Sequence, residues 1–332
     1  MKEVVGDIER WRGRGERFAL ATVVATRRSA PRPVGSKLAV SEGGELAGSV
    51  SGGCVENEVY GAAREVLEGA PPQLLSYGIS DDQALSVGLP CGGEIAVFVQ
   101  EPDAAVLEQA LGVLAREERA VVLTDLETGQ QRLVRDPELE RGRSRLLELD
   151  GRRTFADVYG PPPRLLVLGA VDTAEALCRA AKTIGWRTTV ADARAKFATP
   201  ERLPSADELL VAWPDEALAQ VQPDHATAVV VLTHDDRFDI PALQGALAGE
   251  AFYVGALGSR RNQARRRERL LESGVPEEAV DRISGPAGLD IGADSPAETA
   301  LSILAEILAA RAGRAGGPLK ESPGRIHAEV AG

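Results

Sequence analysis

The first half of the chain alternates short apolar runs with glycine-rich turns. Residues 18–26 (FALATVVAT) and 95–99 are near-continuous apolar runs, which predict buried strands. Residues 38–40 and 45–50 predict a hairpin around Gly43 and Gly44. Helical spacing of apolar positions predicts helices over 4–17, from Cys54 to about Gly69, and over 102–116, and further antiparallel strands are expected at 120–124, 131–134 and 145–149. This mixture predicts an α+β domain over residues 1–160.

The second half of the chain has a different rhythm, in which strands and helices alternate. Strands are predicted at 164–168, 187–191, 208–212, 226–233 and 252–254, with helical patterns between them and another over 260–272. Ser295 to Glu298 is a capping box that opens a last helix with a wide apolar face. This order predicts a Rossmann-like, doubly wound parallel sheet over residues 161–312. The proline run at 161–163 predicts a stiff linker, and residues 313–332 predict a flexible tail.

Composition and charge exclude several classes of protein. The 332 residues carry 50 acidic and 38 basic side chains, a net charge of −12, which argues against general binding to nucleic acid or to anionic membranes. No apolar run approaches membrane-spanning length, and the charged N-terminus does not resemble a signal peptide, so we expect a cytoplasmic protein. In the reducing cytoplasm, we do not expect the three cysteines to form a disulfide framework. The three histidines are far apart, which disfavours a zinc site.

The first candidate site is the loop Gly48 to Val59, where Gly52 and Gly53 precede Cys54. The two glycines permit a sharp reversal and could present backbone amides to a ligand. If Ser51 is the N-cap of the following helix, Cys54 falls in the first turn, where the helix dipole favours a thiolate. The alternative is that Cys54 is a small core residue. Because two glycines precede it, an exposed and activated sulfur is the favoured interpretation.

Two further features of the first domain accompany this loop. Cys91 lies in a second glycine-rich turn, residues 88–93, and repeats the setting of Cys54, although a structural pairing of the two cysteines stays open. Residues 27–37 hold four basic side chains in a proline- and glycine-containing turn, among them Arg32 and Lys37. These could bind an anion, or they could form a solvated basic loop.

In the second domain, the first strand ends in a modified dinucleotide-binding turn. Gly169 and Ala174 fit the pattern G-x-G-x-x-G/A, but Val171 stands at the second glycine, where a side chain obstructs the pyrophosphate. Asp172 adds negative charge where a phosphate would bind. Asp192 occupies the position of a ribose-binding acid. We therefore expect a Rossmann-like fold with weak or no binding of NAD or NADP.

Other strand ends of this domain carry polar side chains at the edge where ligands bind. His234 and Asp235 follow the strongest predicted strand; His234 could act as a base or hydrogen-bond donor, or serve only the turn. Gly258, Ser259, Arg260 and Arg261 combine a flexible turn, a helix N-terminus and two guanidiniums, which suits a phosphate. The alternative is a basic helix start without a ligand.

Taken together, these segments resemble the XdhC/CoxI family, the accessory proteins of xanthine dehydrogenase and related molybdenum hydroxylases. The matching segments span nearly the whole chain in order: 29–32, 48–56, 89–93, 190–194, 232–235, 253–261 and 288–306. The glycine-cysteine loop and the run GLDIG at 288–292 are the most specific of them. The chain departs from the family pattern at Val171 and Asp172, where Gly and His are usual.

This resemblance implies a function. Such a protein would bind molybdenum cofactor transiently, protect it while a cysteine desulfurase supplies a terminal sulfur, and insert it into an apo-hydroxylase of the xanthine dehydrogenase type. It would act as a homodimer in which both domains contribute to cofactor binding. Cys54 would carry persulfide or contact molybdenum, and Arg32, Lys37, Arg260 and Arg261 would hold the pterin phosphate. A soft sulfur suits contact with molybdenum, and cationic hydrogen-bond donors suit a phosphate.

Two other functions remain open from the sequence. The second domain could serve an NAD(P)-dependent oxidoreductase, or the chain could be a docking scaffold that binds no small molecule. Pterin on the purified protein would separate the first function from the other two, and nucleotide titration would separate those two from each other. A maturation chaperone without its own turnover is the preferred interpretation.

Overall fold

The computed structural model describes residues 1–28, 30–78 and 93–321, which divide into two compact units. One consists of Met1–Pro161 and the end of the chain from Leu319, and the other of Pro162–Pro318. The division falls inside the proline run in which the sequence predicts a linker. A 3-10 turn, η1 (Leu319–Glu321), ends the described part of the chain. Within the described residues, no helix is long and apolar enough to cross a membrane.

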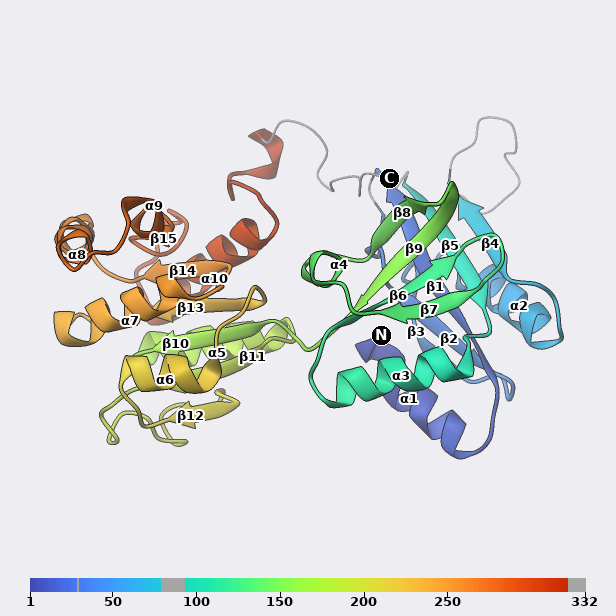
Figure 1. The fold of residues 1–332 in the computed structure, drawn as a ribbon, viewed down its shortest axis with the longest axis horizontal. Helices are drawn as coiled ribbons and strands as arrows, with labels where there is room; N and C mark the ends of the chain where they lie inside the picture. Colours follow the sequence, from blue (N-terminus) through green and yellow to red (C-terminus); the bar gives the residue numbers. More distant parts are fainter. Residues whose placement is uncertain (29, 79–92, 322–332) are drawn as a thin grey trace. The chain divides into compact units, whose positions relative to one another are not determined.

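The first unit contains a five-stranded sheet whose neighbouring strands are antiparallel (Figure 1). Its order is β3 (Leu46–Gly48), β2 (Lys37–Ser41), β1 (Phe18–Arg27), β5 (Glu94–Gln100) and β4 (Gln73–Tyr77). The predicted buried strands β1 and β5 lie side by side at the centre, and β2 and β3 form the predicted hairpin. Both faces of β1 are apolar because one is covered by a helix and the other by helices and by a second sheet.

A second, four-stranded antiparallel sheet completes this unit. Its order is β7 (Gln131–Val134), β6 (Ala120–Asp125), β9 (Arg152–Tyr159) and β8 (Arg145–Leu149). The three strands predicted here are present. The sequence pattern did not predict β9, which pairs with both β6 and β8, because it begins with two arginines.

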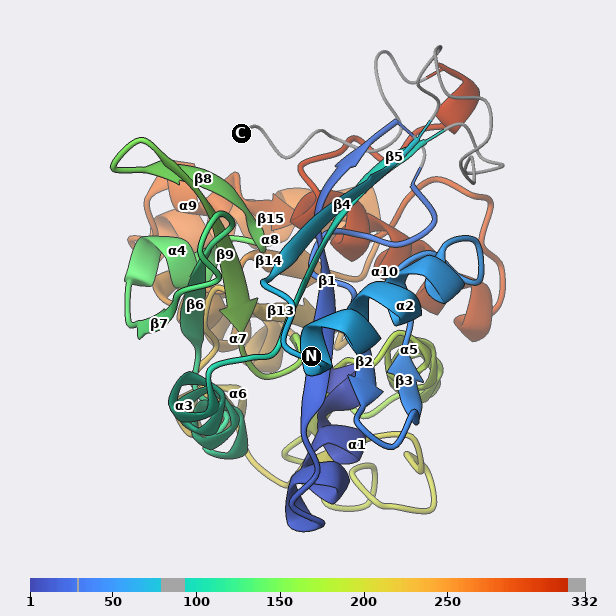
Figure 2. The ribbon, with the colours of Figure 1, turned by 90° about the vertical axis from the view of Figure 1, so that its right-hand side faces the viewer.

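Helices cover one face of the five-stranded sheet and part of the other, where Val24 and Phe98 pack against Phe155 of the second sheet. On one face α2 (Glu56–Leu67) packs Val59, Ala63 and Val66 against the alanines and valines of β1 and β5 (Figure 2). On the other face α1 (Lys2–Gly13) buries Val4, Ile8 and Trp11, together with leucines of α3 (Ala104–Ala115). A short helix, α4 (Pro137–Arg141), joins β7 to β8. The Cys54 loop, which leads into α2, therefore lies on the face of the sheet that α2 covers.

The second unit is a six-stranded, wholly parallel sheet with helices on both faces, as predicted for a Rossmann-like fold. The order is β12 (Glu208–Leu210), β11 (Arg187–Ala191), β10 (Arg164–Leu168), β13 (Thr227–Val231), β14 (Tyr253–Ala256) and β15 (Ile283–Ser284). One face carries α5 (Asp172–Thr183) and α10 (Pro296–Arg311); the other carries α6 (Pro214–Val221), α7 (Asp236–Ala248), α8 (Arg260–Glu272) and α9 (Glu277–Val280).

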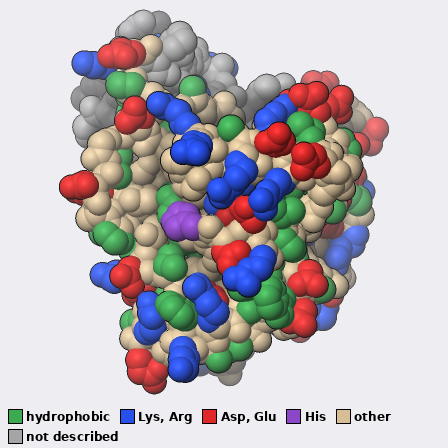
Figure 3. Space-filling model, turned by 90° about the vertical axis from the view of Figure 1, so that its left-hand side faces the viewer, with side chains coloured by type: hydrophobic (Ala, Val, Ile, Leu, Met, Phe, Trp, Pro, Cys, Tyr) green, Lys and Arg blue, Asp and Glu red, His purple; other side chains and the backbone are tan. Residues whose placement is uncertain are grey.

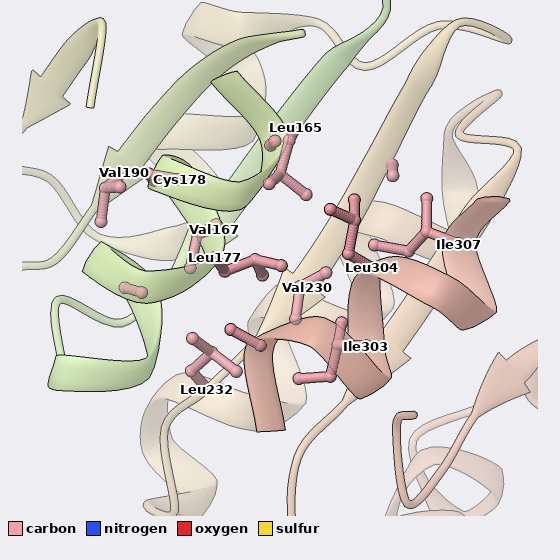
Figure 4. Close-up of a cluster of buried hydrophobic side chains, with 14 of the residues drawn as sticks. Leu165, Val167, Leu177, Cys178, Val190, Val230, Leu232, Ile303, Leu304 and Ile307 are labelled. Carbon is pink, nitrogen blue, oxygen red and sulfur yellow. The ribbon is translucent and has the colours of Figure 1, made fainter. Parts of the chain in front are cut away.

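The core between the sheet and α5 and α10 consists of branched aliphatic side chains (Figure 4). Leu177 of α5 and Ile303 and Ile307 of α10 are fully buried against Val167 and Val230 of the sheet. Ser295 caps α10 with Glu298 as its partner, as the sequence predicts. This rigid layer fixes the direction of the strands, and with it the position of their carboxyl ends.

The strand order places a topological switch point between β10 and β13. From β10 the chain proceeds outward to β11 and β12, and from β13 it proceeds the other way to β14 and β15. Open parallel sheets bind ligands at the carboxyl ends of the strands beside such a point. The loops after β10, β11, β13 and β14 therefore form the candidate site of this unit.

Candidate functional site

The glycine-cysteine loop of the first unit makes the sharp reversal that its sequence predicts. Gly52 and Gly53 have φ angles of 77° and 112°, in the region that favours glycine. A Cβ atom on either glycine would have no neighbour within 4 Å. The glycines are therefore needed for the path of the backbone rather than for space.

The carboxylate of Glu56 lies at the centre of this loop. It accepts the amides of Ser51 and Gly53 at 2.9 and 2.8 Å, and that of Gly52 at 3.0 Å. The hydroxyls of Ser49 and Ser51 also donate to it. The expectation that the glycine amides face a ligand is therefore wrong, because a side chain of the same loop already accepts them. Sequence reasoning missed Glu56, for which an acid at the start of a helix is only a weak signal.

These hydrogen bonds change the protonation of Glu56. Burial alone would raise the pKa of its carboxyl group, but donation from Ser49, Ser51 and the backbone amides lowers it to about 2. Glu56 is therefore a carboxylate at neutral pH, and the loop holds one fixed negative charge. This charge organises the backbone that carries Cys54.

Cys54 occupies the turn before α2, not the first turn of the helix. The amides of Cys54 and Val55 donate to Ser51 Oγ at 2.9 and 3.0 Å, but α2 begins at Glu56 with Val55 as its N-cap. The interpretation of Ser51 as the helix N-cap is therefore wrong, and so is the argument from the helix dipole. Cys54 is half-buried, with part of its surface open to solvent. The second cysteine of this site, Cys91, lies outside the described residues.

The two basic candidates of the first unit already have acidic partners. The Arg32 guanidinium is paired with Glu3. Lys37 is 2% exposed and its Nζ lies 2.5 Å from Asp157 Oδ2. Neighbours in a strand point to opposite faces, and Leu38 packs in the cluster that holds Cys54. Lys37 therefore faces away from the Cys54 loop, and the structure gives it an ion pair between the two sheets.

A cavity lies beside this ion pair. It has a volume of about 340 Å³, and Lys37, Ser144, Asp157 and Tyr159 contribute polar groups to its lining. Ser144 donates to Asp157 at 3.0 Å, so both oxygens of that carboxylate have donors within the unit. Lys37, Ser144 and Asp157 thus bond to one another beside this cavity.

In the second unit, the turn after β10 approaches the loop after β13 very closely. Gly169 has a φ of 117°, and a Cβ atom there would lie 2.8 Å from Cγ2 of Thr233. Glycine is required on both counts. Val171 follows as the N-cap of α5, and Asp172 is the first residue of that helix with a side chain that is 86% exposed. The modified motif therefore forms a strand-turn-helix with valine and aspartate at its tip.

The carboxylate of Asp192, which lies in the ribose-binding position, is already bonded to Arg194. Its two oxygens accept the Ala170 amide at 2.9 Å and the Arg194 guanidinium at 2.9 and 2.7 Å. Burial acts to raise the pKa of Asp192, but these donors outweigh it and the pKa is lowered. The Arg194 guanidinium also lies 4.2 Å from the centre of the Phe197 ring. Sequence reasoning missed Arg194 as a site residue, although it is two residues from Asp192.

The loop after β13 presents His234 and Asp235. His234 is exposed, and Asp235 is the N-cap of α7. Hydrogen bonds from Arg237 lower the pKa of Asp235 to about 2. Figure 3 shows the side of this unit on which α7 and α8 lie, where a histidine lies among Lys or Arg and Asp or Glu side chains. This edge thus presents an exposed imidazole near both acidic and basic side chains.

The turn after β14 has the helix start that its sequence predicts. Ser259 caps α8 by accepting the Asn262 amide, and Arg260 and Arg261 are exposed in the first turn. Gly258 has a φ of 145°, and a Cβ atom there would lie 3.2 Å from the Arg266 guanidinium. The two arginines are therefore available to an anion at this edge.

A small pocket joins three of the four loops. Gly169, Asp192 and Thr233 line it together with Pro214 and Phe238, and its volume is about 10 Å³. Trp213 stacks on Phe238 beside it, and sequence reasoning missed both rings, because single aromatic residues after strands carry no motif. Among the residues that the structure describes, no three His, Cys, Asp or Glu side chains gather as a metal site. Polar and aromatic side chains thus lie side by side at this edge.

Together the fold and the loops define a protein in which an α+β unit that carries a glycine-cysteine loop is followed in sequence by a Rossmann-type unit. Comparison with family models agrees. Residues 165–307 match the XdhC Rossmann domain, and residues 11–78 match the XdhC and CoxI family. The chain belongs to the XdhC/CoxI family.

Two relatives and one solved structure match nearly the whole chain. A protein of Escherichia coli (strain K12) named molybdenum cofactor insertion chaperone PaoD is 32% identical over 90% of this chain and 84% of its own length. A protein of Bacillus subtilis (strain 168) named as a probable subunit of xanthine dehydrogenase is 28% identical over 89% and 94%. The crystal structure of a xanthine dehydrogenase from Bacillus halodurans is 25% identical, with a TM-score of 0.71 over 96% of this chain and 98% of that one.

Proposed function

We propose that this protein binds molybdenum cofactor, supports its sulfuration and inserts it into an apo-hydroxylase of the xanthine dehydrogenase type. The supporting observation is a glycine loop with a half-buried Cys54, in a chain that aligns over 90% of its length with a protein named as a molybdenum cofactor insertion chaperone. The cofactor is cargo, so the protein acts as a chaperone without its own turnover. We place this activity in the cytoplasm, with a cysteine desulfurase as the source of sulfur.

Cys54 has two possible roles in this function. As a sulfur carrier, its thiolate would attack the terminal sulfur of a persulfide on the desulfurase. The S–S bond of the donor breaks, a new S–S bond forms on Cys54 Sγ, and the donor leaves as a thiol, so no external oxidant is needed. As a ligand, the same thiolate would contact molybdenum directly, because soft sulfur suits that metal.

The phosphate of the pterin is assigned to the second unit. Arg260 and Arg261 are exposed at the N-terminus of α8, where two guanidiniums and helix amides favour an anion. Gly258 and Ser259 shape this turn, and His234 and Asp235 lie on the loop of the neighbouring strand. Lys37 and Arg32 already pair with Asp157 and Glu3, so we give them no phosphate contact.

The test is to produce the full chain and a Cys54→Ala variant in cells with an active cofactor pathway. Molybdenum and oxidised pterin fluorescence are measured on the purified proteins, and each protein is then mixed with apo-hydroxylase to measure the activity it restores. We expect cofactor on the wild type, at least tenfold less activity transfer by Cys54→Ala, and unchanged behaviour of the matched control Cys178→Ala.

Each outcome bears on a different part of the proposal. Persulfide on Cys54 after incubation with a desulfurase and cysteine, detected by mass spectrometry, supports the carrier role. Molybdenum retention that falls with Cys54→Ala, without such a persulfide, supports the ligand role. Equal retention and equal transfer by Cys54→Ala would remove Cys54 from the mechanism, and no pterin on the wild type would leave a docking scaffold as the function.

We further propose that the protein is a homodimer. Leu301 and Leu308 lie seven residues apart on α10, on one side of the helix, and are 56% and 39% exposed. Exposed leucines at this spacing suit packing against a second copy. Sedimentation of the wild type and of the double variant Leu301→Lys/Leu308→Lys tests this, with a dimer expected for the first and a monomer for the second. A monomeric wild type would refute it.

A further inference from the structure

Two aromatic rings from different loops stack at the carboxyl edge of the second unit. Trp213 follows β12 and caps α6, and Phe238 lies in the first turn of α7. The ring centres are 4.7 Å apart with an angle of 11° between the planes. The backbone amide of Trp213 donates to Glu216, and Pro214 follows it. The backbone that carries the indole is therefore held in place.

Trp213 differs from the other tryptophans of the chain in its exposure. Its relative exposure is 48%, whereas Trp11 and Trp186 are 0% and 4% exposed. Phe238 stacks on one face of the indole, and about half of the residue is open to solvent. Trp213 is therefore a large, exposed aromatic ring at the edge where open parallel sheets bind ligands.

The surroundings of Trp213 indicate the kind of ligand. The pocket beside it is lined by Pro214 and Phe238 and by the polar residues Asp192 and Thr233. With about 10 Å³ it has room for about one water molecule, so a ring cannot enter it and would lie across its mouth. Arg194, bound to Asp192, is 42% exposed at the same edge.

We propose that Trp213 is the stacking platform for a flat nitrogen heterocycle that carries a phosphate, with the edge of the ring over the pocket. Indole rings stack well on such heterocycles whatever their substituents. This inference rests on the proposed function, in which the heterocycle is the pterin of the cargo. The base of a nucleotide offers the same chemistry, and the experiment separates the two sources.

The exposure of Trp213 supplies the measurement, because the other two tryptophans are buried. The full-length protein is titrated with neopterin monophosphate, and separately with AMP, CMP and inorganic phosphate. Tryptophan emission is followed with correction for absorbance, and affinity is measured independently by equilibrium dialysis. The variants are Trp213→Leu, which removes the ring, Trp213→Phe, which keeps a smaller one, and Trp186→Phe as a buried control.

We expect saturable quenching by the phosphopterin, at least tenfold weaker binding by Trp213→Leu, and less than threefold weaker binding by Trp213→Phe. Trp186→Phe should bind the phosphopterin as the wild type does, and its emission should be quenched to a similar extent. Inorganic phosphate alone should bind without quenching. Quenching by AMP or CMP rather than by the pterin supports the same platform with a nucleotide as its source.

Other results would overturn the inference. Equal pterin affinity in the wild type and Trp213→Leu refutes the platform and leaves the proposed function intact if molybdenum still co-purifies with both. If the wild type binds no pterin and carries no co-purified molybdenum, the proposed function itself is refuted. If no heterocycle binds but Trp213→Leu impairs transfer to the apo-hydroxylase, the exposed ring contacts a protein instead, and the inference is wrong.

Discussion

Arg266 and Asp239 form an ion pair that is almost wholly buried beneath the ligand edge of the second unit. The Nε to Oδ2 distance is 2.8 Å, and the two side chains are 2% and 1% exposed. The same guanidinium donates to the carbonyl of Leu257 at 2.7 Å and to that of Thr233 at 3.1 Å. One side chain of α8 thus connects the loops after β13 and β14, which carry His234 and the Gly258 to Arg261 turn.

Breaking this pair should cost far more stability than breaking a surface pair on the same helix. We expect Arg266→Ala and Asp239→Ala each to lower the free energy of unfolding by about 3 to 5 kcal/mol, because each leaves a buried charge without its partner. Arg269→Ala removes a pair with Asp236 in which the arginine is 49% exposed, and should cost about 1 kcal/mol or less.

Urea unfolding of the full-length variants measures these differences. The double variant Arg266→Met/Asp239→Leu should recover a large part of the loss, since it removes both charges and retains volume. If Arg266→Ala were no more harmful than Arg269→Ala, the pair would not be the link that we describe.

Much of the fold could be predicted because its signals are local. The apolar runs of β1, β5, β10 and β13 and the capping box of α10 depend on neighbouring residues only. Strand β9 escaped prediction because its pattern includes two arginines and Asp157, whose partner Lys37 is 120 residues away in the sequence. A charge buried by a distant partner is indistinguishable, in the sequence, from one on the surface.

The candidate site shows the same limit. Six arginines occur in α8, and helical spacing places Arg266 on the same side as the buried Leu270, but its acidic partner lies 27 residues earlier on another helix. At the Cys54 loop both Ser51 and Glu56 could bind backbone amides, and only the folded loop shows that Glu56 takes most of them. The sequence pattern predicted the turns after β3, β10, β13 and β14, whereas the side chains that hold these turns required the structure.

Glu56 makes the stability of the first unit depend on pH. Its pKa is lowered from an ordinary value of 4.5 to about 2, so the unfolded chain takes up the proton first as pH falls. The stabilisation is therefore fully present above pH 4.5 and is lost as pH falls towards 2. We expect Glu56→Gln to cost about 1 to 2 kcal/mol at pH 7, allowing for partial exposure to solvent.

The measurement is the difference in unfolding free energy between the wild type and Glu56→Gln at several pH values. The difference should shrink below pH 4.5 and become small near pH 2. Glu58→Gln, two residues along the same helix and exposed, is the matched control and should change stability by about 0.5 kcal/mol or less throughout. A difference that stays constant with pH would show that the Glu56 charge does not hold the loop.

The two described cysteines should differ strongly in reactivity. Cys178 is fully buried, and burial raises the pKa of its thiol to about 12, so very little thiolate is present at neutral pH. Cys54 is partly open to solvent. We expect iodoacetamide at pH 7.5 to modify Cys54 roughly tenfold faster than Cys178 or more. Peptide mass mapping after brief labelling resolves the sites, and labelling in urea should abolish the difference; faster modification of native Cys178 would contradict the assignment.

Binding of NAD and NADP should be weak for a reason beyond the missing glycine. Val171 stands at the turn that would accept the pyrophosphate, and the Asp192 carboxylate is already bonded to Arg194 and the Ala170 amide. A dinucleotide would have to displace that guanidinium before its ribose could reach the acid. Tight binding adds about 2.7 kcal/mol of stability at a hundredfold excess over the dissociation constant. We therefore expect no measurable change in melting temperature with millimolar NAD or NADP.

Two variants test whether these two features are the cause. Val171→Gly removes the obstruction alone, and Val171→Gly/Arg194→Ala also frees Asp192. If the structural reason is right, the single variant should bind NAD no better than the wild type, and the double variant should show a shift in melting temperature that grows with NAD concentration. Arg179→Ala, which removes an exposed arginine of α5, is the matched control and should leave the titration unchanged. A clear shift with the wild type would contradict this prediction, because the bonded Asp192 would then be no barrier to a dinucleotide, and the oxidoreductase function would have to be considered again.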